Sequence, residues 1–206
     1  LDVVQPMRVD PTVEHLGLRE RKKHQARQRI AHAAHELFQA RGFDHVTMAD
    51  VAVAADVSVK TVFNYFGTKE DLAFEGENQV IAAWLGAIRH RAAGTGPIDA
   101  VRALITDRVD SEVEARLAEF AELVAASPDL QSRLRLLWDR LEEAVTRVLV
   151  VESGQPDDLF EIATARVEAA RVVSVIRLYF SDDVRAYLAD GGDPAAWLDR
   201  AYAQPD

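Results

Sequence analysis

The sequence predicts an all-α fold. Apolar residues recur at three- and four-residue steps along most of the chain, as they do on one face of a helix. No segment alternates apolar and polar residues with a period of two for long enough to predict a strand. Glycine, proline or a capping residue separates successive periodic segments. We therefore expect about nine to ten helices in one or two compact domains, which a chain of 206 residues is long enough to form.

Capping residues divide the amino-terminal third of the chain into short helices. A periodic segment over residues 25–41 ends at Gly42. Thr47 and Ser58 are good N-caps, because each hydroxyl can accept a backbone N–H that the first helical turn leaves unpaired. Thr68 begins a further helix in the same way. The second and third helices, joined by a tight turn, predict a helix-turn-helix, in which the third helix can lie in a DNA major groove.

The third helix of this motif has an inner and an outer face. We expect Val62, Phe63 and Phe66 to face inward. On the outer face, Lys60 can donate to guanine, and Thr61 can form a hydrogen bond or contact a thymine methyl group. Near the end of the helix, the phenol of Tyr65 and the ammonium group of Lys69 could reach phosphates. The candidate DNA-binding residues are Thr47, Ser58, Val59, Lys60, Thr61, Asn64, Tyr65 and Lys69.

Charge is distributed unevenly along the chain. There are 34 acidic and 24 basic side chains, and the net charge of −10 argues against a general nucleic-acid binder. Through Lys69 there are 10 basic and 8 acidic residues, a balance of +2, whereas the remainder has 14 and 26, a balance of −12. Residues 19–29 form a basic run opposed only by Glu20, which is either a solvated segment or part of a nucleic-acid-binding surface. The basic residues of this run are Arg19, Arg21, Lys22, Lys23, Arg27 and Arg29.

The stretch from Phe43 to Leu72, FDHVTMADVAVAADVSVKTVFNYFGTKEDL, resembles the DNA-binding signature of the TetR family of transcriptional regulators. The resemblance rests on the capping threonine, the Asp-x-Ala core, the Val-Ser turn, the Phe-Asn-Tyr-Phe block and the Thr-Lys-Glu-Asp-Leu at the next helix. Asp56 stands where the family most often has glycine, and aspartate tolerates left-handed backbone angles better than most residues. Lys60 and Gly67 also depart from the commonest pattern, the latter at the junction between the third and fourth helices.

The resemblance implies how the chain is divided and what it does. We expect a flexible arm over residues 1–18, a DNA-binding domain over 19–68, and a helical effector-binding and dimerisation domain over 69–206. The implied function is that of a homodimeric repressor, which a small and largely apolar molecule releases from a palindromic double-stranded DNA operator. A two-fold pair would read two half-sites, whereas one recognition helix reads few bases. The alternative is a DNA-binding dimer whose second domain is gated by a protein partner or only dimerises.

The second domain gives weaker signals. We expect one helix from Lys69 to His90, a second that begins at Pro97, and a third that ends at Ser127-Pro128. A fourth runs from there to Gly154 and a fifth from 157 to 179, and a short helix follows Asp193-Pro194. The candidate ligand-binding residues, which could equally be ordinary core, are Trp84, Ile88, Arg108, Phe120, Trp138 and Tyr179. The candidate dimer residues, which could instead make an internal core contact, are Val167, Ala170, Val173 and Ser174.

Several classes of protein are not expected. The chain has no cysteine, which excludes disulfide scaffolds and thiol nucleophiles and favours a cytoplasmic protein. The longest near-apolar stretch, Val80 to Ile88, has about nine residues against the roughly 20 that span a bilayer, and no secretion signal is visible. The three-residue spacing of His32 and His35, with Glu36 beside them, could hold a metal, but no further ligand is evident, so we expect no metal or cofactor. Nothing in the sequence predicts an enzyme.

Overall fold

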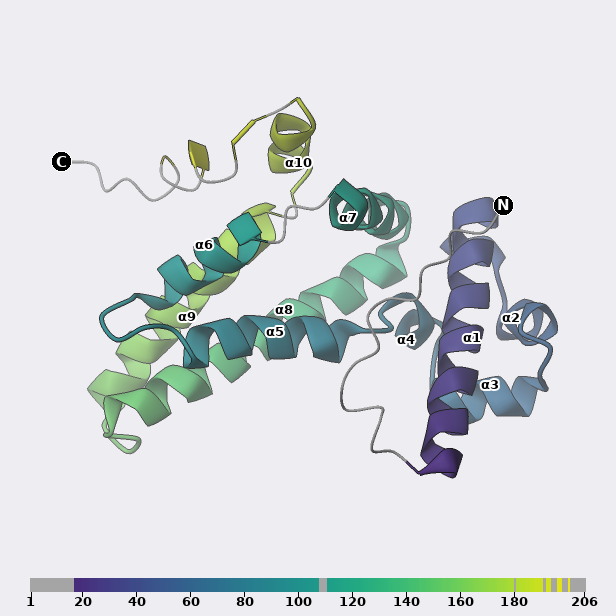
Figure 1. Cartoon of the computed structure of the whole chain (residues 1–206), viewed down its shortest axis with the longest axis horizontal. Helices are drawn as coiled ribbons and strands as arrows, with labels where there is room; N and C mark the ends of the chain where they lie inside the picture. The colour runs from purple at the N-terminus through teal and green to yellow at the C-terminus, as the bar shows by residue number, and fades with distance from the viewer. Residues whose placement is uncertain are drawn as a thin grey trace. The chain divides into compact units, whose positions relative to one another are not determined.

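The computed structural model describes residues 17–107, 111–179, 181–190, 192–193, 196–197 and 200, and the elements found there are helical (Figure 1). The expected all-α fold is confirmed. The described residues form two compact units, one ending at Glu75 and one beginning at Gly76, and each is described by itself. In chain order the helices are α1 (Leu18–Arg41), η2 (Phe43–His45), α2 (Met48–Ala54), α3 (Val59–Tyr65), α4 (Lys69–Ala73), α5 (Glu77–Arg89), α6 (Pro97–Asp107), α7 (Ser111–Ala125), α8 (Pro128–Ser153), α9 (Leu159–Tyr179) and α10 (Asp182–Ala189).

Helix α1 is the scaffold of the first unit. Its apolar residues at three- and four-residue steps, Ile30, Ala34 and Phe38, are buried, and they face α2, α4 and η2. The ring of Phe38 lies 5.1 Å from that of Phe43, in a tilted arrangement. Helix α2 packs in turn against α3. The three short helices therefore depend on α1 for their core.

Each short helix begins at a capping side chain, as the sequence predicts. The Thr47 hydroxyl accepts the Asp50 N–H at 3.1 Å, while the Asp50 carboxylate accepts the Thr47 N–H at 2.8 Å. Thr68 and Asp71 form the same capping box, and Ser58 accepts a backbone N–H from α3 at 3.0 Å. The side-chain hydrogen bond from Thr47 lowers the pKa of the Asp50 carboxyl. The capping box therefore stabilises the helix fully above the pH range in which carboxyl groups usually titrate, and it weakens as the pH falls through that lowered pKa.

The turn between α2 and α3 passes through a residue in the left-handed region. Asp56 has φ +53°, and it is the one non-glycine residue with positive φ among those the structure describes. The Val57 N–H donates to the Ala52 carbonyl at 2.9 Å and closes the turn. Aspartate therefore takes the conformation for which the TetR family most often uses glycine.

The helix expected from Lys69 to His90 is instead two helices. Helix α4 ends at Ala73 and α5 begins at Glu77, with Gly76 between them at φ +93°. The expectation of one continuous helix is wrong because a left-handed residue cannot continue a right-handed helix. Helix α4 packs against α1, so the first unit extends to Glu75 rather than ending at Thr68.

Two glycines, Gly76 at the N-cap of α5 and Gly86 within it, should respond oppositely to alanine. Gly76→Ala should lower the free energy of unfolding by about 1–2 kcal/mol, because alanine is strained at positive φ. Steric contact does not add to this strain, since the nearest atom to the added Cβ, Gln79 Oε1, lies 3.8 Å away. Gly86→Ala should raise the free energy of unfolding by about 0.5–1 kcal/mol. Gly86 lies inside the helix, and apart from the backbone of that helix no atom lies within 4 Å of the added Cβ. Urea unfolding of both variants measures the two values. Equal effects would contradict the left-handed assignment at Gly76.

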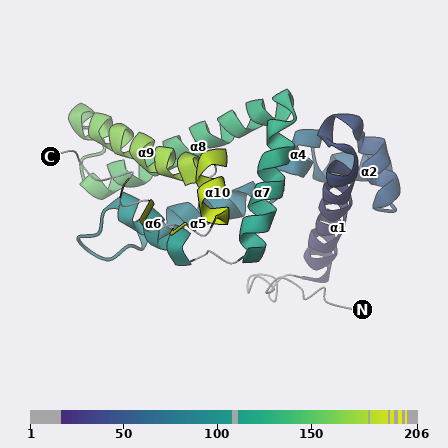
Figure 2. The ribbon, with the colours of Figure 1, turned by 90° about the horizontal axis from the view of Figure 1, so that it is seen from above.

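The second unit is built on the pair α8 and α9, which lie side by side and pack against α5 and α6 (Figure 2). Pro97 opens α6, Ser127 and Pro128 begin α8, and Gly154 at φ +70° ends it, all as predicted. Helix α10 was not expected, and the short helix predicted after Asp193 falls mostly outside the described residues. The core of this unit contains Trp84, Ile88, Val101, Ile105, Leu141, Val145, Val148, Ala169, Val172, Val173, Val175, Ile176, Tyr179 and Val184.

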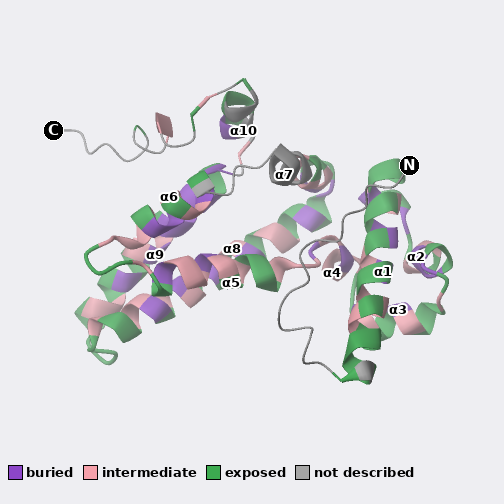
Figure 3. Ribbon diagram, viewed as in Figure 1, coloured by how far each residue is buried: buried purple, intermediate pink, exposed green. Residues whose placement is uncertain are grey.

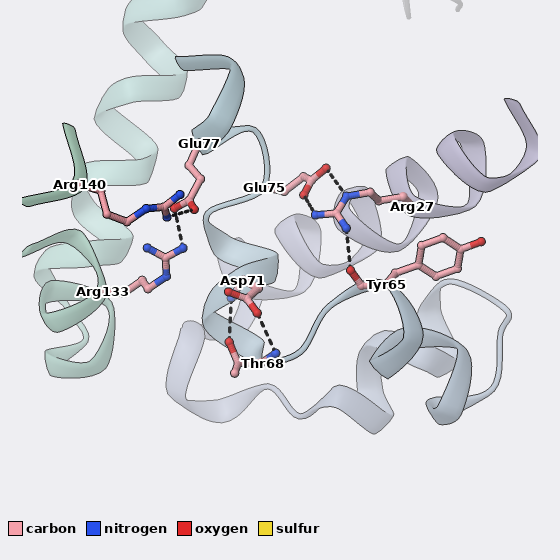
Figure 4. Close-up of polar contacts among 8 residues, drawn as sticks. All are labelled: Arg27, Tyr65, Thr68, Asp71, Glu75, Glu77, Arg133 and Arg140. Carbon is pink, nitrogen blue, oxygen red and sulfur yellow. Dashed lines mark hydrogen bonds and ion pairs between the residues drawn. The ribbon is translucent and has the colours of Figure 1, made fainter. Parts of the chain in front are cut away.

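Ion pairs tie α5 to α8 near both ends of α5. At its start, the Glu77 carboxylate accepts hydrogen bonds from Arg133 and Arg140, each at 2.6 Å (Figure 4). Beyond its end, Arg91 and Glu152 form a bidentate pair at 3.0 and 2.7 Å. The hydrogen bonds that Arg91 donates to the Glu152 carboxylate raise the pKa of its guanidinium. In the described part of the chain, no helix is long and apolar enough to cross a membrane.

Candidate DNA-binding surface

Helix α3 turns a polar and basic face to solvent. Ser58, Lys60 and Asn64 are exposed, whereas Val62 and Phe66 are almost completely buried, as expected from the sequence. Lys60 and Asn64 lie four residues apart and so share one side of the helix, and Ser58 lies at its N-cap. The exposed surface of the helix and its cap thus carries an ammonium, an amide and a hydroxyl group, which are the donors and acceptors that read base edges in the major groove.

Phe63 was expected to face inward, and this expectation is wrong. Its side chain is 52% exposed, and Val59, one helical turn earlier, is 41% exposed. The helix has only seven residues, and it and its C-cap bury Val62 and Phe66 against their neighbours, so within the described part of the chain no element covers the side on which Phe63 lies. The outer face of α3 therefore has two large apolar side chains beside its polar ones.

Three of the candidate hydroxyl groups already have partners within the unit. The Ser58 and Thr61 hydroxyls lie 2.8 Å apart, and both belong to the start of α3. The Thr47 hydroxyl donates to the Asp50 carboxylate at 2.5 Å. A hydroxyl has one donor and two lone pairs, so each can still accept a hydrogen bond from DNA while it holds its helix start in place.

Lys69 also has partners within the first unit. Its ammonium donates to the Phe43 carbonyl at 2.9 Å and lies 4.0 Å from the centre of the Phe43 ring. The side chain thus joins α4 to η2. A phosphate contact by Lys69, as the sequence suggested, would require this ammonium to serve the phosphate in addition to, or in place of, the carbonyl.

Arg27 is a positioning residue that sequence reasoning did not single out from the basic run. Its guanidinium makes two hydrogen bonds to the Glu75 carboxylate, at 2.8 and 2.5 Å, and one to the Tyr65 carbonyl at 2.6 Å (Figure 4). It also lies 4.2 Å from the centre of the Phe66 ring. Arg27 of α1 therefore binds both the end of α3 and Glu75, the last residue of the first unit. These contacts join residues far apart in the sequence, so only the three-dimensional fold shows the role of Arg27.

The candidate ligand-binding residues of the second unit are partly brought together. Trp84, Ile88 and Tyr179 belong to one buried cluster, and Trp138 packs against it with the Arg177 guanidinium 5.8 Å from its ring centre. Phe120 lies half-buried on α7 and is outside that cluster. Arg108 lies outside the described residues.

The candidate dimer residues do not share one face. Val167 is 63% exposed and Ser174 is exposed, while Ala170 is half-buried. Val173 is 1% exposed and belongs to the core of its own chain, so it cannot also offer its side chain to a partner, and its assignment is wrong. The exposed face of α9, called the α9 stripe below, consists instead of Phe160, Thr164, Val167, Arg171, Ser174 and Leu178.

The histidines of α1 lie on its surface. His32 Nε2 is 3.5 Å from the Glu36 carboxylate, and both side chains are largely exposed. Among the described residues, no group of three histidine, aspartate or glutamate side chains is arranged to hold a metal ion.

A helix-turn-helix followed by a separate helical unit defines a class of DNA-binding proteins. Residues 30–75 match the family described as bacterial regulatory proteins, tetR family. The chain is 30% identical over 146 residues to the HTH-type transcriptional regulator TcmR of Streptomyces glaucescens, covering 67% of this chain and 65% of that protein. It is 47% identical over 55 residues to the HTH-type transcriptional regulator LuxR of Vibrio harveyi, covering 27% of each. The chain belongs to the tetR family of transcriptional regulators.

Solved structures share the fold. The TetR family transcriptional repressor FadR of Thermus thermophilus, in complex with lauroyl-CoA, superposes with a TM-score of 0.51 at 27% identity, over 84% of this chain and 90% of that one. NalD of Pseudomonas aeruginosa, the secondary repressor of the MexAB-OprM multidrug efflux pump, has a TM-score of 0.53 at 20% identity, over 86% and 93%. The chain covers less than two thirds of the length of TcmR and of LuxR. The likeness of fold to the solved structures extends over most of the chain.

Proposed function

We propose that this protein is a homodimeric transcriptional repressor that binds a palindromic DNA operator and leaves it when a small molecule binds the second unit. The observation that carries the proposal is the exposed outer face of α3, presented by a unit whose helix starts are capped and whose core is packed on α1. Family membership supports a regulator rather than an enzyme.

The outer face of α3 has the chemistry to read a specific sequence. Lys60 can donate to guanine O6 and N7, and Asn64 can pair with the adenine edge. Val59 and Phe63 are exposed apolar side chains one turn apart, which suits contact with thymine methyl groups. We expect the half-site to contain a guanine with thymines nearby.

The α9 stripe is the surface that we propose for dimerisation. Phe160, Val167 and Leu178 are 75%, 63% and 46% exposed, and each lies on the same side of a helix of 21 residues. Thr164 and Ser174 between them are small enough for a second helix to approach closely. An exposed apolar stripe of this length is unusual on a monomer and fits a second copy of the same chain.

The effector site is proposed in the cluster around Trp84, Trp138 and Tyr179. These side chains lie together on three different helices and are large, apolar and polar-tipped, as ligand-binding residues often are. The complex of the Thermus thermophilus FadR repressor with lauroyl-CoA supports an effector that is a small molecule with a long apolar part. All three tryptophans of the chain follow residue 75, so intrinsic fluorescence is a direct probe of this site.

A DNA titration at two salt concentrations tests the proposal. The purified protein is titrated against the DNA that flanks its own coding sequence, with random DNA of the same length as the control. The expected result is selective binding of two chains per palindrome, which a small-molecule effector weakens while it changes the tryptophan fluorescence. Binding to the two DNAs with equal affinity at both salt concentrations would reject the proposal. Selective binding by a dimer that a protein, and no small molecule, releases would support the alternative of a protein-gated regulator.

Two lysines of this unit should behave differently when each is replaced by alanine. Lys60→Ala should weaken binding to the selected operator by about 1–3 kcal/mol and relax the preference at one base pair, because the exposed ammonium reads a base edge. Lys69→Ala should mainly lower the stability of the first unit, because it removes the bond to the Phe43 carbonyl. Binding assays on single-base operator variants, together with thermal unfolding, separate the two effects. If both variants bound specific and random DNA like the parent, the assigned surface would be wrong.

A further inference from the structure

The first three turns of α1 form a basic segment that does not belong to the core of the unit. Between Leu18 and Arg29 there are six basic residues and one acidic residue, Glu20. From Arg19 onward, where the structure describes the side chains of the helix, none is buried before Ile30. Within the described residues, Arg27 pairs with Glu75, and none of the other five cations has an acidic partner. Those five, all exposed, are Arg19, Arg21, Lys22, Lys23 and Arg29. Figure 3 shows the first turns of α1 mainly in the colour of exposed residues.

This charge lies at the end of the helix where it is least favourable. The unpaired N–H groups make a helix amino terminus positive, so cations there oppose helix formation and anions favour it. The N-cap of α1 is Gly17, which provides no side-chain cap. The basic residues therefore do not stabilise this end of α1, and a local conflict of this kind is typical of residues kept for a binding partner.

The basic segment lies close to the recognition helix within the first unit. The Arg27 guanidinium binds the Tyr65 carbonyl at the end of α3 (Figure 4), so the basic residues that flank Arg27 in α1 are near that end. The segment of residues 18–29 is about 18 Å long at 1.5 Å per residue. Double-stranded DNA carries one negative charge per about 1.7 Å of its axis, so several phosphates lie within this length.

We propose that the basic segment is a second DNA-binding surface, which binds the phosphate backbone next to the base pairs that α3 reads. The proposal rests on the proposed function and adds to it an interaction that is independent of sequence. Its partner is a duplex phosphate backbone, because the segment continues from the recognition helix and its charge is complementary. A lipid surface is less suitable, because Ala26 is the only apolar residue between Arg19 and Arg29 and nothing there could insert between acyl chains.

The proposal predicts a specific change in salt dependence. The variant Lys22→Gln/Lys23→Gln is titrated with operator and random DNA between 50 and 200 mM salt. If the two lysines contact two phosphates, the plot of log K against log salt should become shallower by about 1.8, and affinity near 0.1 M salt should fall by about tenfold per contact. The ratio of operator to random affinity should stay within about threefold of the parent, because the base contacts of α3 are unchanged. The protected region of the backbone should also be shorter.

A matched variant and a stability measurement control for indirect effects. Arg89→Gln/Arg135→Gln removes the same charge from two exposed arginines of the second unit and should leave the salt slope unchanged. The lysine variant should unfold at the same temperature as the parent or higher, since cations at the positive helix end have been removed. Weaker DNA binding without loss of stability would identify a binding role and not a structural one.

Each failure has its own meaning. If the parent binds its operator selectively and the lysine variant keeps the parental salt slope, the basic segment does not contact phosphates and the inference is overturned. If both double variants lose the same slope, only net charge matters and the inference is again overturned. If the parent itself shows no selective binding, the proposed function fails before the basic segment is tested. Binding of the parent to anionic vesicles, abolished in the lysine variant while the DNA slope is unchanged, would assign the segment to membranes instead.

Discussion

Phe66→Ala is expected to unfold the DNA-binding unit while the second unit stays folded. The Phe66 side chain is 1% exposed, caps the end of α3 and lies under the Arg27 guanidinium at 4.2 Å. Truncating a buried phenylalanine costs about 3–5 kcal/mol, which is a large share of the stability of a small unit. The variant should lose DNA binding and part of its helical circular dichroism. Because every tryptophan follows residue 75, the fluorescence unfolding transition should change little.

Phe63→Ala is the matched control for this experiment. It removes the same side chain three residues earlier on the same helix, but from a position that is 52% exposed. Its effect on stability should stay within about 1 kcal/mol, while DNA affinity falls. Phe66→Leu, which keeps most of the buried volume, should fold and bind DNA at reduced stability. Equal stability losses for Phe63→Ala and Phe66→Ala would contradict the assigned faces of α3.

Val167→Glu is expected to convert the dimer into a monomer. Val167 lies at the middle of the α9 stripe and is 63% exposed, so the charge is tolerated in the single chain. Where the α9 stripe pairs with its copy about its middle, the two new carboxylates lie close together, and like charges at an interface cost several kcal/mol. The dimer dissociation constant should rise by at least about 100-fold. Sedimentation equilibrium measures this directly, and operator affinity should fall with it.

Val80→Glu provides the comparison. Val80 is 48% exposed on α5, so it introduces the same charge on another helix of the same unit. The dimer constant should not change. A Val167→Glu protein that still dimerises like the parent would show that the α9 stripe is not the interface, and Leu178→Glu would then give the same negative result.

The fold could be predicted where local chemistry decides it. Thr47, Ser58 and Thr68 each cap a helix through a backbone N–H three residues further on, and this requires no knowledge of distant contacts. The break at Gly76 could not be predicted in the same way. A glycine inside a periodic segment is compatible with a continuous helix or with a left-handed break, and packing of α4 on α1 selects the break.

The candidate site shows the same limit. The residues at the start of α3 are exposed because the cap fixes their direction, and the sequence assigned them to the outer face. Phe63 was misassigned because a helix of seven residues has neighbours on only part of its circumference, and hydrophobicity does not say which part. Arg27 lies 38 residues from Tyr65 and 48 from Glu75, so its role depends on contacts that no local pattern records. Val173 was misassigned because small and β-branched residues suit both a core and an interface.

The short helices of the first unit also determine how it opens. Helices α2, α3 and α4 have seven, seven and five residues, far below the roughly 12–15 at which an isolated helix becomes stable in water. None of them can persist without its packing, which is on α1 for α2 and α4 and on α2 for α3, so their amide protons should exchange with solvent together, at one common free energy. The turns of α1 before Arg27 have no buried side chain among those described, and they should exchange earlier. Partial loss of the recognition surface is therefore not an available state: the helix-turn-helix is present as a whole or absent as a whole.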